Sequence, residues 1–112
     1  VHSKVTIMDD VFTVISSANL NTRSMQVDTE LGIIMECADV AEGLRKRLWD
    51  LHTNKNFAAN PDDMHDYVVA KGVFKIWQQL INTNKKLSGT GTSPDCALRE
   101  FYRADPTVSR SD

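Results

Sequence analysis

Strand-forming residues dominate the first fifteen positions of the chain, with one acidic interruption. Val, Ile, Thr and Phe make up most of residues 1–15, and Asp9-Asp10 breaks the run. Two such runs separated by a short polar pair are typical of a β-hairpin. We therefore predict two strands joined by a tight turn at Asp9-Asp10.

The two-residue repeat of a strand assigns the side chains of the first run to opposite faces. Val5 and Ile7 share an apolar face, which we expect to pack into the core. His2, Lys4 and Thr6 share the other face. The strand is therefore expected to present an imidazole and an ammonium side by side.

Residues 31–37 (LGIIMEC) form a short and nearly continuous apolar run. This pattern predicts a strand that is buried on both faces, as in a sheet covered by helices. Cys37 ends the run, and we expect its side chain to be a small buried one. With Cys96 as the second cysteine of the chain, at most one internal disulfide is possible.

Apolar residues then recur at helical spacing. A helix is predicted to start at Asp39, with Glu42 three residues later in a capping-box arrangement. Its apolar stripe consists of Ala41, Leu44, Leu48 and Leu51. The basic residues 45–47 (Arg-Lys-Arg) crowd the other side, and we interpret them as a solvated helix face rather than a patch for lipid headgroups.

A second helix is predicted to open at Asn60-Pro61, with Asn60 as the N-cap and Pro61 in the first turn. Its apolar stripe, interpreted as core, consists of Tyr67, Ala70, Phe74, Trp77 and Ile81. Residues 87–94 (LSGTGTSP) are predicted to be a loop, and the tail beyond them to be irregular. The expected fold is α/β, a mixed β-sheet with packed helices, in one domain over residues 1–112.

Composition narrows the class of protein. The chain has 112 residues, 41% of them hydrophobic and 25% charged, which is typical of a globular domain. The net charge is -2 and the basic residues form no stripe, so nucleic acid is the less expected partner. No apolar stretch reaches the length of a transmembrane helix. The histidines and cysteines lack the close pairing of a zinc site, and no metal is expected.

The polar residues near the N-terminus suit a phosphodiester, whose charge must be met by donors already in place. Lys4 supplies a positive charge, Asn19 two amide donors and Ser17 a hydroxyl. An imidazole such as His2 can exchange a proton near neutral pH and can attack phosphorus. A carboxylate is then expected to orient the ring, and the nearest downstream candidates are Asp28 and Glu30.

The pattern of these residues closely resembles the signature of the phospholipase D superfamily, H-x-K-x4-D followed by G-S-x-N. Here the signature reads His2-Ser3-Lys4, then Asp9, then residues 16–19 (SSAN). Residues 20–30 are similar to the continuation of that motif, and residues 44–52 to the helix that follows it. Residues 98–109 are a fainter match. Ser16 departs from the pattern, because it stands where the signature has glycine.

The resemblance implies a mechanism and a role for each residue. Members usually carry two such motifs: one histidine forms a phosphohistidine, the other acts as general acid and base, and no metal or other cofactor takes part. By analogy Lys4 and Asn19 contact phosphate oxygens, Ser17 supports the site and Glu30 holds the ring of His2. Asp9 belongs to the catalytic motif but is expected to shape the loop. The candidate catalytic residues are therefore His2, Lys4, Asp9 and Glu30, and the candidate phosphate-binding residues are Lys4, Ser17 and Asn19.

The same resemblance makes this motif the C-terminal one of a pair, with a motif region at residues 1–37 and a helical and tail region at 38–112. We therefore expect a fragment of a phospholipase D-like lobe whose partner is an upstream motif-bearing half, in the same chain or in a second subunit. The implied substrate is a glycerophospholipid, taken at a peripheral membrane surface. Two alternatives stay open: a nuclease-like phosphodiesterase that pairs single motifs across a dimer, and a non-catalytic module that holds phosphate.

Overall fold

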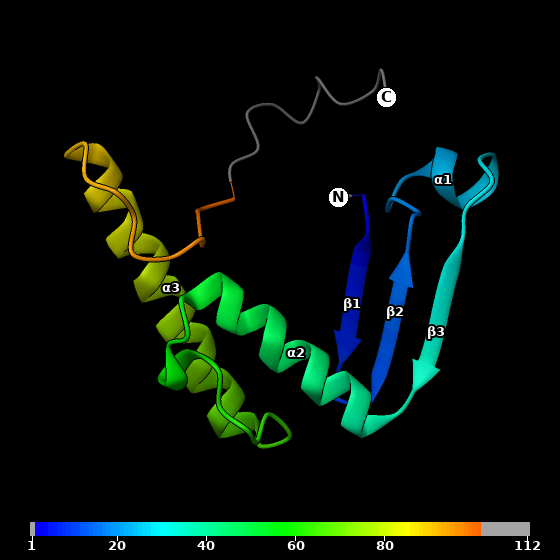
Figure 1. The fold of residues 1–112 in the computed structure, drawn as a ribbon, viewed down its shortest axis with the longest axis horizontal. Helices are drawn as coiled ribbons and strands as arrows, with labels where there is room; N and C mark the ends of the chain where they lie inside the picture. Colours follow the sequence, from blue (N-terminus) through cyan, green and yellow to red (C-terminus); the bar gives the residue numbers. More distant parts are fainter. Residues whose placement is uncertain (1, 102–112) are drawn as a thin grey trace.

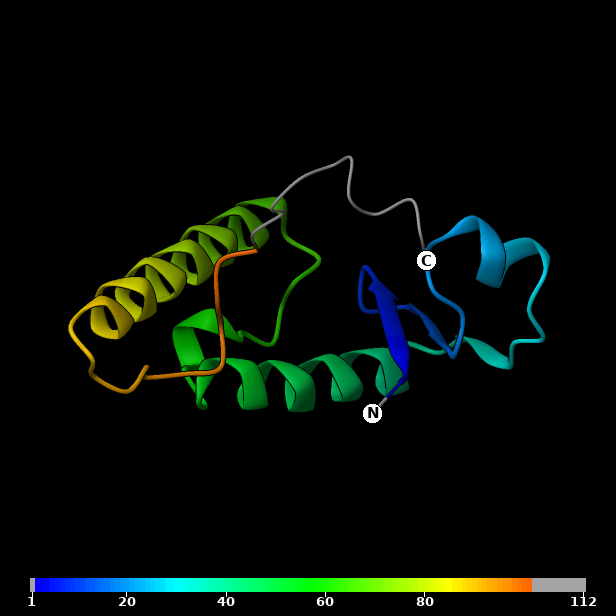
Figure 2. The same cartoon turned by 90° about the horizontal axis from the view of Figure 1, so that it is seen from above.

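The computed structural model describes residues 2–101 of the chain. A three-stranded sheet lies at one end, α2 leads away from it, and α3 packs against α2 at the other end (Figures 1 and 2). The elements in chain order are β1 (Lys4–Met8), β2 (Phe12–Ser16), α1 (Thr22–Gln26), β3 (Gly32–Glu36), α2 (Ala38–Thr53), the 3-10 helix η1 (Phe57–Ala59) and α3 (Tyr67–Gly89). The predicted combination of a sheet with packed helices is confirmed.

The predicted hairpin is present, with its turn where the acidic pair interrupts the pattern. β1 pairs with β2 in antiparallel fashion, and the amide of Val11 donates to the carbonyl of Met8 at 3.0 Å. The two residues between them, Asp9 and Asp10, both have positive φ angles, of 51° and 53°. Two left-handed residues closed by such a hydrogen bond make the turn that matches the twist of a hairpin.

The third strand forms but is not buried on both faces as predicted. β3 pairs only with β2, so the order of the sheet is β1-β2-β3 and all described pairs are antiparallel. Its Ile33 and Ile34, which point to opposite faces, are 60% and 70% exposed. Cys37, expected to be buried, is exposed. The apolar run was correct evidence for a strand, but within residues 2–101 no helix covers it.

The first long helix starts one residue earlier than predicted and without the expected capping box. Its N-cap is Cys37, whose side chain makes no capping hydrogen bond. Asp39 lies inside the first turn instead, where a carboxylate is favourable for the helix dipole. The helix ends at Asn54, whose left-handed conformation (φ 54°) makes a regular C-terminal cap.

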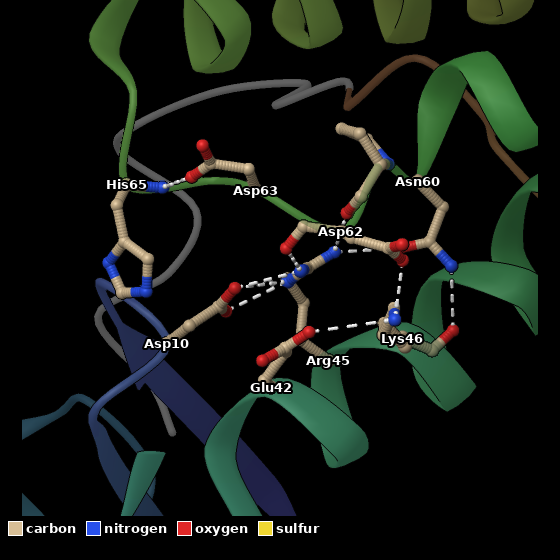
Figure 3. A network of polar contacts seen from close by, with 9 residues as sticks. Asp10, Glu42, Arg45, Lys46, Asn60, Asp62, Asp63 and His65 are labelled. Carbon is tan, nitrogen blue, oxygen red and sulfur yellow. Dashed lines mark hydrogen bonds and ion pairs between the residues drawn. The ribbon is translucent and has the colours of Figure 1, made fainter. Parts of the chain in front are cut away.

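The interpretation of residues 45–47 as a solvated face is wrong for Arg45, whose side chain is only 4% exposed. Its guanidinium forms a buried ion pair with Asp10 of the hairpin turn, with Nη2 2.8 Å and Nε 2.8 Å from the carboxylate (Figure 3). The helical pattern alone placed Arg45 on a polar face. The pattern did not reveal that this face contacts the carboxylate of Asp10, which is also buried.

The remaining donors of Arg45 reach the loop that precedes α3. Nη1 donates to Oδ1 of Asn60 at 2.8 Å and to the carbonyl of Pro61 at 3.0 Å, and Nη2 donates to the carbonyl of Asp62 at 3.2 Å. Asn60 in turn donates to the carbonyl of Lys46 at 2.9 Å (Figure 3). All five N–H groups of the guanidinium are therefore used.

Asn60 has this anchoring role in place of the predicted N-cap. The second long helix, α3, begins later, at Tyr67, where Asp66 caps it by accepting from the amides of Val68 and Val69. It also runs to Gly89, so the first part of the predicted 87–94 loop is helical. Asn60, which is buried, and Pro61 belong to the preceding loop. The side chain of Asn60 and the carbonyl of Pro61 already bond to Arg45, and Asn60 also bonds to the backbone of α2.

The side chains that α3 buries differ in part from the predicted stripe. Tyr67 and Phe74, predicted as core, are 75% and 64% exposed. The buried side of α3 instead carries Val73 and Asn84, with Trp77 half-buried between them. Trp77 packs edge-on against Trp49 of α2 with ring centroids 4.8 Å apart, and this contact joins the two helices.

Residues 90–101, which follow α3, are irregular, as predicted, but hydrogen bonds from Asn84 hold part of this segment firmly. Buried Asn84 donates to the carbonyls of Cys96 and Leu98 at 3.0 and 2.8 Å and accepts from the amide of Asp95 at 3.0 Å. Most of the faintly similar segment 98–109 lies outside the described residues. Within residues 2–101, no helix is long and apolar enough to cross a membrane.

The arginine network predicts a large and specific loss of stability. Arg45→Ala leaves the carboxylate of Asp10 buried without a partner, which should lower the free energy of unfolding by about 3–5 kcal/mol. Arg45→Lys should also be destabilising, because an ammonium cannot reproduce the planar set of five donors. Urea denaturation measures both variants.

Arg47→Ala is the matched control, because the neighbouring Arg47 is exposed. It should change the free energy of unfolding by no more than about 0.5 kcal/mol. An Arg45→Ala variant that is as stable as Arg47→Ala would contradict the structural role given to the network.

Candidate functional site

The end of the sheet opposite the Asp9-Asp10 turn gathers most of the predicted polar residues. β1 starts there, β2 ends there and β3 starts there, with α1 beside them (Figure 1). His2 and Lys4 come from the start of β1, Ser17 follows β2, and Glu30 precedes β3. Antiparallel pairing brings these four positions together although they span 29 positions of the sequence.

His2 and Lys4 lie side by side, as the strand repeat predicted. Nζ of Lys4 is 2.9 Å from Nε2 and 3.2 Å from Nδ1 of His2, and both side chains are accessible at this edge. Nζ also donates to the carbonyl of His2 at 2.9 Å. An imidazole and an ammonium therefore share this open edge of the sheet.

Ser17 connects the strand end to the other polar groups through both its backbone and its side chain. Its carbonyl accepts from Nζ of Lys4 at 3.1 Å. Its hydroxyl donates to Oε2 of Glu30 at 2.5 Å and accepts from the amide of Leu31 at 3.1 Å. Since the hydroxyl proton is committed to Glu30, Ser17 in this arrangement holds other groups in place.

Glu30 is held in its charged form by the groups around it. Hydrogen bonds from the hydroxyls of Ser17 and Ser24, and the nearby positive charges of His2 and Lys4, keep the pKa of this carboxyl below its ordinary value. Its hydrogen-bonding partners are thus serines, and the ring of His2 is contacted by Lys4 instead. Asp28, the other candidate to orient the ring, pairs with Arg23 on the surface at 3.0 Å.

Asn19 and Asp9 occupy very different positions relative to this cluster. Asn19 is half-buried in the loop between β2 and α1, two residues after Ser17, and its carboxamide has no hydrogen-bond partner within residues 2–101. Asp9 is exposed in the hairpin turn, five residues beyond Lys4, so roughly 16 Å of strand separates them. Asp9 therefore shapes the turn and does not face the cluster.

A shallow hollow of about 290 Å³ opens at the cluster, and its walls include His2, Ser16, Ser17 and Gly32. A larger hollow of about 770 Å³ has Val5 and Ile7 of β1 and Trp77 of α3 in its mainly apolar walls. The smaller hollow is the better candidate for phosphate, because His2, Ser16 and Ser17 line it and Lys4 contacts the ring of His2. Within residues 2–101, no group of three His, Cys, Asp or Glu side chains is placed to hold a metal ion.

Sequence reasoning missed the short helix α1 and the contribution of Ser24. The side chain of Asn21 caps α1 by accepting from the amide of Ser24 at 2.8 Å. Ser24 is buried there and its hydroxyl helps to hold Glu30 in the charged form. Asn21 three residues before a serine is a recognisable N-cap signal, but five residues are too few for a helical repeat to be read.

The lowered pKa of Glu30 predicts a specific dependence of stability on pH. The unfolded chain takes up a proton on this residue near the ordinary value of 4.5, whereas the folded chain does so only at lower pH. The stabilisation by Glu30 is therefore complete above that value and is lost as the pH falls through the folded pKa. Thermal unfolding between pH 7 and acid should show a steeper loss for the wild type than for Glu30→Gln.

Glu36→Gln is the matched control, since Glu36 is exposed at the far end of β3. Its acid profile should follow that of the wild type. Parallel profiles for the wild type and Glu30→Gln would contradict the role given to the two serine hydroxyls.

Comparison with known proteins gives one family and one relative. The family described as "Cardiolipin synthase, PLD-like domain" matches residues 1–52, which include the whole cluster. Phospholipase D C of Dictyostelium discoideum is 30% identical over 128 aligned positions, which cover 91% of this chain but only 8% of that protein. The search of solved structures found no significant match. These similarities agree with the motif and its geometry, and the chain is a member of the phospholipase D superfamily.

Proposed function

We propose that this chain carries one half of an active site that cleaves or transfers a glycerophospholipid phosphodiester. The observation that supports the proposal most directly is the contact between Lys4 and His2 at an open sheet edge. A charged donor is then already in place beside a group that can move a proton. Both are required before a P–O bond can be broken at neutral pH.

In the proposed reaction, non-bridging phosphate oxygens are held by Lys4 and by the free carboxamide of Asn19. Ser17 acts as a positioning residue, because its carbonyl fixes the ammonium of Lys4 and its hydroxyl fixes Glu30. The negative charge of Glu30 stabilises the imidazolium that forms when His2 takes up a proton. Asp9 keeps the hairpin turn in shape and takes no part in the chemistry.

His2 is proposed as the general acid and base, with a second histidine as the nucleophile. The second imidazole attacks phosphorus, a P–N bond forms, the P–O bond to the leaving alcohol breaks, and His2 gives that oxygen its proton. His2 then takes a proton from water or from an acceptor alcohol, whose oxygen attacks phosphorus and releases the second imidazole. Neither His52 nor His65 lines the hollow at His2, so the nucleophile belongs to a second motif.

We propose that this second motif lies elsewhere in a longer chain or in a second subunit, and that the motif described here is the C-terminal one of the pair. The similarity of residues 44–52 to the helix after the second motif supports this order. The chain spans only 8% of the relative named above, so most of that protein has no counterpart here.

A lipid is favoured as the substrate by the surface next to the cluster. Leu20 and Leu31 are among the most exposed large apolar residues of the chain, and Leu31 also lines the hollow at His2. An apolar rim beside a phosphate site suits an amphiphile whose acyl chains leave the headgroup. The family and the relative, named for a cardiolipin synthase and a phospholipase D, agree with this choice.

Two other functions use the same cluster. A nuclease-like phosphodiesterase would pair single motifs across a dimer and would need a basic groove, for which a net charge of -2 gives no support. A phosphate-binding module without catalysis would need only Lys4 and Asn19. The role of His2 separates this last possibility from an enzyme.

The variant His2→Ala, made in the full-length protein, should lower phosphodiesterase turnover by about two orders of magnitude or more. Removal of the imidazole leaves the leaving oxygen without a proton donor, while Lys4 can still hold phosphate. Release of headgroup from a short-chain phosphatidylcholine measures the rate.

His52→Ala is the matched control, because His52 is an exposed histidine outside the hollow at His2. It should retain the turnover of the wild type. Full turnover in His2→Ala would show that His2 is not the acid and base.

A further inference from the structure

Ser16 has a side chain at the one position where the signature of the family has none, and its surroundings suggest a use for that side chain. In the register of the sheet, Ser16 lies directly opposite Lys4 on one side and Gly32 on the other. Directly opposite residues of antiparallel strands point to the same face, with their Cβ atoms about 5 Å apart. The hydroxyl of Ser16 is therefore on the face that carries Lys4.

Gly32 provides the space that Ser16 occupies. A Cβ atom added at Gly32 would lie 3.2 Å from both Cβ and Oγ of Ser16, closer than side-chain atoms normally pack. Gly32 lies in an ordinary strand and has no positive φ angle, so the close approach of Ser16 is the structural reason for a glycine here. The sizes of the two residues are therefore coupled. With a side chain at residue 16, residue 32 has room only for a glycine.

The hydroxyl of Ser16 has one hydrogen-bonding function still free. Its oxygen accepts from the amide of Ala18 at 2.9 Å, which fixes the rotamer and the start of the loop to Asn19. Its proton is not donated to any group within residues 2–101. Ser16 is half-buried and lines the same hollow as His2 and Gly32. Ser16 thus offers a fixed hydroxyl with a free proton on the sheet face that carries Lys4.

We propose that Ser16 is an additional substrate-binding residue, whose hydroxyl donates to a non-bridging oxygen of the phosphodiester next to Lys4. The inference rests on the proposed function and deepens it. The fixed acceptor bond from Ala18 orients the hydroxyl before the ligand arrives, so little rotational freedom is lost on binding. Ser17, whose proton is committed to Glu30, is not available for this contact.

The test is direct binding of inorganic phosphate to the full-length protein, measured by isothermal titration calorimetry. Ser16→Gly and Ser16→Ala remove the donor and should raise the Kd for phosphate by about tenfold or more, the usual effect of losing a hydrogen bond to a charged acceptor. Thr6→Val is the matched control. It removes a hydroxyl from the same face of β1, one row further from the cluster, and should leave the Kd unchanged.

A second set of variants tests the coupling to Gly32. Gly32→Ala should raise the Kd in the wild-type background, because the new methyl group displaces the hydroxyl of Ser16. In the Ser16→Gly background the same change should have little further effect, so the two substitutions should be strongly non-additive. Equal effects of Gly32→Ala in both backgrounds would overturn the steric part of the inference.

A structural role alone for Ser16 gives a different outcome. If the hydroxyl only holds the loop through Ala18, Ser16→Gly should lower the melting temperature while the Kd for phosphate stays within about twofold, and the inference is then wrong. Turnover of a short-chain phosphatidylcholine shows whether Ser16 also contacts the phosphate of a lipid. If Ser16→Gly raises the Kd for inorganic phosphate but leaves the KM for the lipid unchanged, the contact is made to free phosphate only. Failure of the proposed function would show as full turnover in His2→Ala, whereas failure of this inference shows in the Kd.

Discussion

The buried ion pair between Asp10 and Arg45 is the interaction on which the arrangement of the whole chain depends. It joins three segments that are distant in sequence: the hairpin turn, the middle of α2, and the loop before α3 (Figure 3). The described part of the chain has few buried apolar residues, namely Ala41, Ala59, Val73 and Cys96. With so small a core, the five directional bonds of one guanidinium determine how the sheet and the helices are joined. A buried charge is tolerated here because each donor finds an acceptor.

This interaction also explains why the candidate site can be polar and open. β1 is anchored at one end by Asp10, which leaves the other end to carry His2 and Lys4 without any need for burial. The cluster there is held by local bonds from Ser17 and by the register of the sheet, both of which are independent of α2 and α3. The anchoring ion pair and the candidate site thus lie at opposite ends of β1, a strand of five residues. A substitution at one end should therefore have limited effect at the other.

Much of the candidate site could be predicted from the sequence, because strand alternation is a strict rule. The two-residue repeat placed His2 beside Lys4, and the acidic pair gave the turn. The helical repeat correctly indicated two long helices, but it could not distinguish buried Arg45 from exposed Arg47, since burial of an arginine depends on acceptors far away in sequence. The start of α3 was misplaced for the same reason: Asn60-Pro61 is a good helix start locally, but Arg45 uses its polar groups. β3 was predicted to be covered on both faces, and within the described residues it is not.

The most direct test of the account is whether the ring of His2 responds to phosphate. Side-chain ¹⁵N NMR of the full-length protein, with histidines labelled, would follow the imidazole nitrogens during titration with inorganic phosphate. The account predicts that the signals of His2 shift, because phosphate takes the ammonium of Lys4 away from the ring, while those of His52 and His65 do not. An unchanged His2 spectrum at saturating phosphate would contradict it.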